Sequence, residues 1–134
     1  MILSVKTQEK TELIDVTSEI NQAIQKSGIE QGLCMLYVPH TTAAVTINES
    51  ADPSVKADML MVLNKIIPWE AGYRHLEGNS AAHIKTTLVG SSELIAIEGR
   101  RLVLGTWQGI FFCEFDGPRN RKLQVRIIEE RFAC

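Results

Sequence analysis

The first third of the chain alternates short apolar runs with polar turns, a pattern typical of β-strands. The predicted strands are residues 2–8, 11–16, 31–38 and 43–48. A helix is predicted between them, over residues 17–28, because apolar residues there recur at helical spacing. Thr17 or Ser18 can cap its start, and Gly28 is a typical stop. The opening segment therefore combines strands with one helix.

Two further helices are predicted in the middle of the chain. Asp52 suits the N-cap of the first and Pro53 its first turn, and the apolar pattern then runs until Pro68 ends it. Ser80 can cap the second, which has about ten residues and stops before Gly90. Each helix thus carries its own start and stop signals.

Strand patterns dominate after Gly90. The predicted strands are residues 92–97, 101–115 and 123–131, and D-G-P-R-N-R-K at 116–122 is the turn between the last two. Within the second run, Gly105 marks a bulge or a close backbone approach, whereas Trp107 is typical of a core residue. There is no linker, no regular βαβ alternation and no nucleotide-binding glycine motif. We therefore expect one α+β domain over residues 1–134, with a mixed but largely antiparallel sheet.

The composition excludes several classes of function. With 45% hydrophobic and 22% charged residues, the chain is typical of a globular protein. Its net charge of −2 gives no electrostatic attraction to DNA or RNA, so no nucleic-acid partner is expected. No apolar run approaches the roughly 20 residues that cross a bilayer, and the N-terminus has no basic region ahead of an apolar stretch. Neither a membrane partner nor a signal peptide is expected.

The cysteines indicate a reducing compartment. Cys34, Cys113 and Cys134 are an odd number without C-x-x-C spacing, which argues against a disulfide framework or a zinc ribbon. Cys34 and Cys113 lie inside strand-like apolar runs, where inert core thiols are expected. The predicted location is the cytoplasm.

All three histidines lie in polar or small-residue segments rather than in apolar strands. His40 follows a predicted strand, and His75 and His83 flank the turn before the third helix. Neutral imidazoles bind zinc and similar divalent metals, and three of them leave a position open for water or substrate. The spacing does not force the rings together, so an independent role for each histidine in its own loop remains an alternative.

The turn Gly78-Asn79-Ser80 is a candidate anion site. A helix N-terminus presents unpaired N–H groups and a partial positive charge, which together bind phosphate or carboxylate. Gly78 lets the backbone approach closely, and Asn79 and Ser80 add hydrogen-bonding side chains. A plain helix cap at Ser80 explains the same residues.

Two carboxylates and one arginine complete the candidates. Glu77 lies between two histidines, where it can be a ligand, support a ligand or act as a general base. Asp52 belongs to an acidic cluster, although capping its helix is its most economical role. Arg119 lies in the basic turn at 116–122, and its guanidinium suits phosphate as well as it suits a solvated turn.

Four stretches taken together resemble the YjbQ family of small microbial proteins. They are H-T-T-A-A-V-T-I-N-E with D-P at 40–53, H-L-E-G-N-S-A-A-H-I-K at 75–85, L-G-T-W-Q at 104–108 and E-F-D-G-P-R at 114–119. The resemblance covers nearly the whole chain. It implies a compact α+β domain with a partly barrel-like sheet and about three helices, assembled as a homotrimer.

The resemblance also implies an activity. Family members are associated with a weak, secondary thiamine-phosphate synthase activity, which joins a pyrimidine diphosphate to a thiazole phosphate and releases pyrophosphate. We therefore expect a metal-dependent enzyme that acts on a small phosphorylated metabolite. A non-catalytic trimeric binding module for such a metabolite and a metal-dependent hydrolase are the alternatives.

The expected site combines three sets of residues. A divalent metal, zinc in the first place, would be held by His40, His75 and His83. The phosphate would lie against Thr41, Gly78, Asn79, Ser80 and Arg119. Glu77 and Asp52 would act as acid–base groups or support the ligands.

Overall fold

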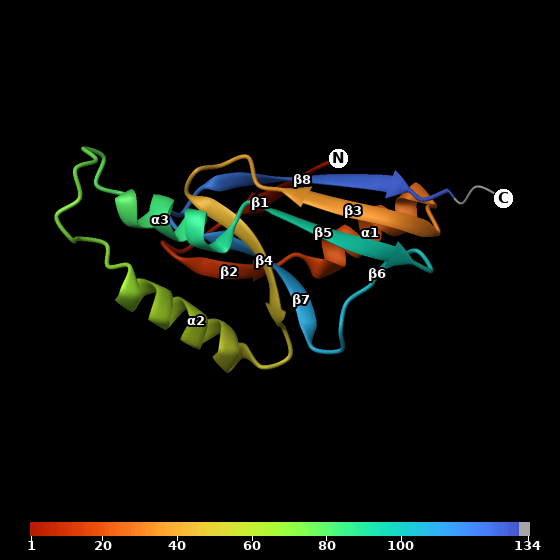
Figure 1. Ribbon diagram of the computed structural model, residues 1–134, viewed down its shortest axis with the longest axis horizontal. Helices are drawn as coiled ribbons and strands as arrows, with labels where there is room; N and C mark the ends of the chain where they lie inside the picture. Colours follow the sequence, from red (N-terminus) through yellow and green to blue (C-terminus); the bar gives the residue numbers. More distant parts are fainter. Residues whose placement is uncertain (132–134) are drawn as a thin grey trace.

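Two antiparallel sheets and three helices make up the computed structural model, which describes residues 1–131 (Figure 1). The larger sheet has the strand order β1 (Ile2–Lys6), β8 (Asn120–Glu129), β3 (Gln31–Tyr37), β5 (Ser92–Glu98) and β6 (Arg101–Leu102). The smaller sheet has the order β2 (Glu12–Asp15), β7 (Gln108–Glu114) and β4 (Ala43–Glu49). The helices are α1 (Thr17–Ser27), α2 (Pro53–Ile66) and α3 (Ser80–Val89). The predicted α+β class is confirmed, and every strand pair in the described chain is antiparallel.

The small sheet is buried on both faces. Its inner face, with Val45 and Phe112, packs against the large sheet and α1 in the main core. Its outer face, with Ala44 and Phe111, packs against α2, α3 and the segment around Trp69 in a second core. This double burial explains why the run I-F-F-C-E-F at 110–115 is buried throughout rather than alternating.

Four of the six predicted helix starts and stops are confirmed, and among them α2 ends at Ile66, before Pro68, and α3 ends at Val89, before Gly90. The Asp52 side chain accepts from the backbone N–H of Ser54 at 2.9 Å and so caps α2, with Pro53 in the first turn. Gly28 ends α1 in the left-handed region, at φ 72°. These signals are local, because each residue acts on its own helix end.

The other two caps are wrong. The N-cap of α1 is Val16, whose side chain makes no capping hydrogen bond. The Thr17 hydroxyl accepts from the N–H of Ile110 in β7 instead of capping the helix. Helix α3 begins at Ser80, so its N-cap is Asn79, whose side-chain amide donates to Asp116. In both places the side chain next to the helix start bonds to a distant segment instead of capping the helix.

The predicted strand over residues 101–115 is two strands in different sheets. The chain leaves the large sheet after Leu102 and enters the small sheet at Gln108, with Gly105 in the connection. Trp107 lies in this connection with 63% of its surface exposed, so its expected place in the core is wrong. Its carbonyl accepts from the N–H of Ser50, which fastens the connection to the end of β4.

The two described cysteines are buried, as predicted. Burial raises the pKa of Cys34 to about 11 and that of Cys113 to about 12, so both thiols stay protonated and unreactive near neutral pH. Cys134 lies outside the described residues. No helix within residues 1–131 is long and apolar enough to cross a membrane.

Helix α2 keeps much of its apolar surface open to solvent. None of its fourteen residues is fully buried, although Met59 and Leu63 pack at the edge of the second core. Met61, Val62 and Ile66 are about half exposed or more, at 60%, 47% and 61%. Within residues 1–131, part of the apolar surface of α2 is thus left uncovered.

A buried ion pair joins β7 to β8. Arg121 donates from Nε to Glu114 Oε1 at 2.9 Å, and its Nη2 donates to the other carboxylate oxygen. The Thr7 hydroxyl also donates to Glu114, at 2.7 Å, and Arg121 Nη2 donates to the Thr42 hydroxyl at 2.8 Å. Glu114 is 0% exposed and Arg121 is 5% exposed. The pair therefore links four segments of the chain, and its carboxylate is fully shielded from solvent.

The ion pair also affects the pKa of Glu114. Burial alone would raise this pKa, but hydrogen bonds from Arg121, Thr7 and the N–H of Asp116, together with the Arg121 charge, lower it below the ordinary value of 4.5. A carboxylate with a depressed pKa stabilises the fold above its unfolded-state pKa and loses that contribution as the pH falls through its folded-state pKa.

We expect Glu114→Gln to lower the free energy of unfolding by roughly 3–5 kcal/mol at neutral pH, because the amide leaves the buried Arg121 charge without its partner. Chemical denaturation measures the loss. The gap between the native protein and the variant should begin to shrink as the pH falls below 4.5, where Glu114 of the unfolded chain becomes protonated, and should narrow until the pH passes the lowered pKa of native Glu114.

The matched control is Glu30→Gln. Glu30 accepts from Arg100 at 2.8 Å, nearly the same distance, but on the surface, so its loss should cost about 1 kcal/mol or less. If both variants lost a similar free energy of unfolding at neutral pH, the larger contribution expected from the buried pair would be contradicted.

Candidate functional site

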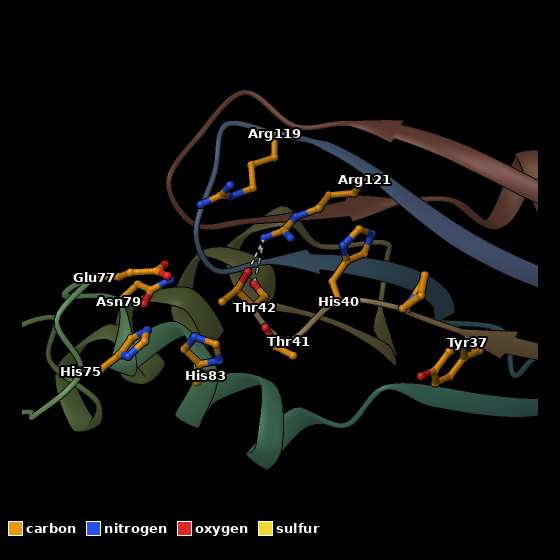
Figure 2. Close-up of a pocket in the computed structure, with 11 residues that line it drawn as sticks. Tyr37, His40, Thr41, Thr42, His75, Glu77, Asn79, His83, Arg119 and Arg121 are labelled. Atoms are coloured by element: carbon orange, nitrogen blue, oxygen red, sulfur yellow. Dashed lines mark hydrogen bonds between the residues drawn. The ribbon is translucent and has the colours of Figure 1, made fainter.

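The main cavity of the chain, with a volume of about 680 Å³, lies where β3 ends and α3 begins (Figure 2). Its lining comes from three segments: the turn after β3, the loop into α3, and the start of β8. The residues are Tyr37, Pro39, His40, Thr41, Thr42, His75, Glu77, Asn79, His83, Arg119 and Arg121. Most of them are polar or charged, which is typical of a site that binds a hydrophilic ligand.

One wall is formed by the turn after β3 together with β8. The Nε2 atom of His40 accepts from the backbone N–H of Lys122 at 3.0 Å, and this bond fixes the ring against β8. Burial, and after it the nearby Arg121 charge, lowers the pKa of His40 below its ordinary value. His40 is therefore neutral near pH 7, with its lone pair at Nε2 already engaged.

The opposite wall is the loop into α3 and the first turn of that helix (Figure 2). Gly78 adopts φ 76° and its N–H donates to the carbonyl of His75 at 3.1 Å, which closes a tight turn between His75 and the helix. The turn brings the ring of His75 to 5.5 Å from that of His83, centroid to centroid, at an interplanar angle of 86°. Glu77 projects from the same loop.

Asp116 holds two lining residues in place. Its Oδ2 accepts from Asn79 Nδ2 at 2.9 Å and from Arg119 Nη2 at 3.0 Å, and its carbonyl accepts from Arg119 Nε at 2.7 Å. Burial acts to raise the pKa of Asp116, but the donors Asn79 and Arg119 outweigh it and leave this pKa below its ordinary value. The Arg119 guanidinium is thus oriented while its side chain stays 52% exposed.

The charges around the cavity favour an anion. Arg119 and Arg121 face Glu77 across it, with His40 beside Arg121 and with His75 and His83 on the side of Glu77. Arg121 is balanced by Glu114 behind the wall, whereas the exposed part of Arg119 can reach a ligand. The N-terminus of α3, a ten-residue helix, adds its N–H groups and partial positive charge.

The structure brings most of the predicted residues to one region. His40, Thr41, His75, Glu77, Asn79, His83 and Arg119 line the main cavity. Gly78 lines an adjoining cavity, and Ser80 lines a third hollow beside His75 and His83. Asp52 is elsewhere: it caps α2 and lines none of these three hollows.

The three histidines do not lie together as a ready-made set of metal ligands in the described chain. No group of three or more His, Cys, Asp or Glu side chains among residues 1–131 is arranged to hold a metal ion. His40 is also unsuited at Nε2, because that atom already accepts a hydrogen bond. His75 and His83 fit better: with a Zn–N distance of about 2 Å, two imidazole centroids around one tetrahedral ion lie roughly 5 Å apart, close to the 5.5 Å found here.

Sequence reasoning did not assign Tyr37, Thr42 or Arg121 to the site. Arg121 could have been found, because it shares the inward-facing alternation of Leu123 and Val125 in β8, and an inward arginine needs a buried partner. Thr42 bonds that same guanidinium. Tyr37 gives no comparable signal, since its place depends on where β3 meets the loop into α3.

The comparisons with known proteins agree on one family. The family model described as "UPF0047 protein YjbQ-like" matches residues 1–130. The chain is 50% identical to UPF0047 protein YugU of Bacillus subtilis, over 94% of this chain and 96% of that protein. It is 53% identical to UPF0047 protein MJ1081 of Methanocaldococcus jannaschii, over 95% of this chain and 92% of that protein.

Solved structures give the same result. The crystal structure of an uncharacterized YjbQ/UPF0047 protein from Clostridium acetobutylicum superposes with a TM-score of 0.93 at 51% identity, covering 96% of this chain and 99% of that one. A hypothetical protein from Aeropyrum pernix gives a TM-score of 0.92 at 36% identity, covering 97% and 98%. These names assign no activity to the relatives. The chain belongs to the UPF0047 family of YjbQ-like proteins.

Proposed function

We propose that the chain is an enzyme that binds the phosphate of a small metabolite in the main cavity. The observation that carries the proposal is the convergence of Arg119, the N-terminus of α3 and three imidazoles on one polar cavity of about 680 Å³. A phosphate accepts hydrogen bonds on several oxygens, and an arginine fork with helix N–H groups suits it. The volume is sufficient for a small metabolite rather than a polymer.

The activity that we propose is a thiamine-phosphate synthase-type transfer, and it comes from the family resemblance. A carbon–nitrogen bond forms between the pyrimidine methylene and the thiazole nitrogen, while the carbon–oxygen bond to the diphosphate breaks and pyrophosphate leaves. Negative charge grows on the leaving oxygens, and Arg119 with the start of α3 would stabilise it. Glu77, which lines the cavity, would act as the acid–base group, whereas Asp52 has no part in this proposal.

Two alternative functions would use the same cavity. A binding module would hold the phosphorylated metabolite without turnover, and a hydrolase would release phosphate from a single ester. Both need the same anion contacts, so substrate turnover separates them. The buried, protonated thiols of Cys34 and Cys113 support the cytoplasmic location that we infer.

Purified protein should form thiamine phosphate from the pyrimidine diphosphate and the thiazole phosphate, and Arg119→Ala should lower kcat/KM about ten- to a hundred-fold. A hydrogen bond to a charged group contributes about 1.5–3 kcal/mol, which gives this range. Product is measured by oxidation to fluorescent thiochrome phosphate and chromatography.

Arg101→Ala is the matched control, because Arg101 is an exposed arginine beside α1 that lines none of the three hollows next to α3. It should retain the native rate. Equal rates in all three proteins would indicate a contaminating enzyme. Binding of pyrophosphate without turnover would favour the binding module, and phosphate release from one ester alone would favour the hydrolase.

We also propose a divalent metal at this site, zinc in the first place, in a form that the histidine positions support. His75 and His83 would supply two imidazole ligands, and a bound metal would add a Lewis acid next to the substrate phosphate. His75→Ala and His83→Ala should each reduce the zinc that copurifies, as measured by elemental analysis. His40→Ala should not, because its Nε2 accepts from Lys122.

Equal zinc in the native protein and all three histidine variants would contradict the pair as ligands. A loss in His40→Ala as large as in His83→Ala would instead favour the three-His centre. Folding of each variant is checked by thermal unfolding, so that metal loss is not mistaken for loss of structure.

The homotrimer implied by the resemblance is proposed as well, and the open apolar face of α2 supports a contact between copies. Light scattering after size exclusion should give three times the mass of one chain. Ile66→Glu should shift the protein toward single chains, because it places a charge on this face. Lys65→Glu, next to it on the same helix, should leave the mass unchanged; a native single-chain mass would contradict the trimer.

A further inference from the structure

A second cavity, with a volume of about 530 Å³, adjoins the main one. The two share four lining residues: His75, Glu77, Asn79 and Arg119. These four residues border both cavities and form their common wall. One ligand that lies against them can therefore extend into both cavities. The phosphate proposed for the main cavity leaves this second space unassigned.

The second cavity differs from the first in its chemistry. Two aromatic side chains, Trp69 and Tyr73, contribute to its lining. Its carboxylates are Glu70, Glu77 and Asp116, and its cations are Lys10 and Arg119. Carboxylates thus outnumber cations here, whereas in the main cavity Glu77 faces two arginines. Aromatic faces with carboxylates beside them bind positively charged groups.

Lys10 shows where such a group fits. Its Nζ lies 3.7 Å from the centroid of the Trp69 ring and 3.8 Å from Asp116 Oδ1. An ammonium between an aromatic face and a carboxylate marks a cation position. The Lys10 side chain is 55% exposed, and exposed ion pairs contribute little, so another cation can displace it at small cost.

Asn79 provides a second, independent observation on the common wall. Asn79 is only 7% exposed, and its Nδ2 donates a hydrogen bond to Asp116. Its Oδ1 is also buried, and none of residues 1–131 donates a hydrogen bond to it. A buried acceptor without a donor is costly, so the wall shared by the two cavities carries an unsatisfied polar group.

We propose that the second cavity binds a planar, positively charged ring, which belongs to the same molecule as the phosphate in the main cavity. The ring stacks on Trp69 in place of the Lys10 ammonium, next to Asp116 and Glu70. The substrate or product class is therefore a phosphorylated compound with a cationic heterocycle. The pairing of ring and phosphate in one molecule rests on the proposed function, whose product carries a cationic thiazolium ring and a phosphate; the cation position itself is argued from Trp69, Asp116 and Lys10.

The test uses Trp69 as its reporter. The chain has two tryptophans, and Trp107 is exposed, so Trp107→Phe leaves a single indole N–H signal in the nitrogen–proton spectrum. This protein is titrated with 1-methylnicotinamide, a planar cation, and with neutral nicotinamide as the matched probe. The cation should shift the Trp69 signal in a saturable way, and the neutral ring should do so far more weakly.

Two variants in the Trp107→Phe background separate a binding site from a surface contact. Lys10→Ala removes the competing ammonium, so the cation should bind roughly two- to five-fold tighter, in line with the worth of an exposed cation–π contact. Glu70→Gln removes a carboxylate of the cavity without touching Trp69 or Asp116 and should weaken binding of the cation.

Three results would overturn the proposal: no saturable shift with the cation, equal binding of the neutral ring, or weaker binding in Lys10→Ala. The last would show that Lys10 helps the ligand instead of occupying its place. Pyrophosphate titrated into the same sample tests the phosphate cavity separately. In Arg119→Ala, loss of pyrophosphate binding with retained cation binding would show that the two subsites stand independently.

Discussion

The buried pair of Glu114 and Arg121 is the interaction on which the site depends. A charge without water is tolerable only when its partner and its hydrogen bonds are all in place, so this pair fixes the segments that supply them. Thr42 bonds the guanidinium and Thr7 bonds the carboxylate. The turn bearing His40 and Thr41 ends at one of these contacts, and Arg119 lies two residues from another. One wall of the main cavity is therefore positioned from inside the fold.

Double burial of the small sheet positions the other wall. Because β7 and β4 have apolar side chains on both faces, the outer face needs a cover, and α2 and α3 supply it. Helix α3 approaches through Ala81 and Ala82, whose small side chains are fully buried and allow close contact. This packing carries the start of α3 to the cavity, and with it Asn79 and His83. A larger side chain at Ala82 would move the helix end away from Arg119.

Sequence patterns gave the elements whose signals are local, as the Asp52 cap and the Gly28 stop illustrate. They failed where a distant partner decides the outcome. Thr17 left its expected cap position for the N–H of Ile110, and Trp107 lies in a connection whose course depends on the change of sheet at Gly105. The site shows the same division. The pattern identified the three histidines, but it could not show that Lys122 holds His40 apart from the other two.

Asp116 connects the two cavities electrostatically. On one side its Oδ2 holds Asn79 and Arg119, and on the other its Oδ1 lies near the Lys10 ammonium. If a ligand cation replaces Lys10, the carboxylate stays balanced and Arg119 keeps its orientation toward the phosphate that we propose. If the position is left empty, the Asp116 charge acts more strongly on Arg119 and draws it from the ligand. A single carboxylate can thus favour molecules that carry both a cation and a phosphate over those that carry only one.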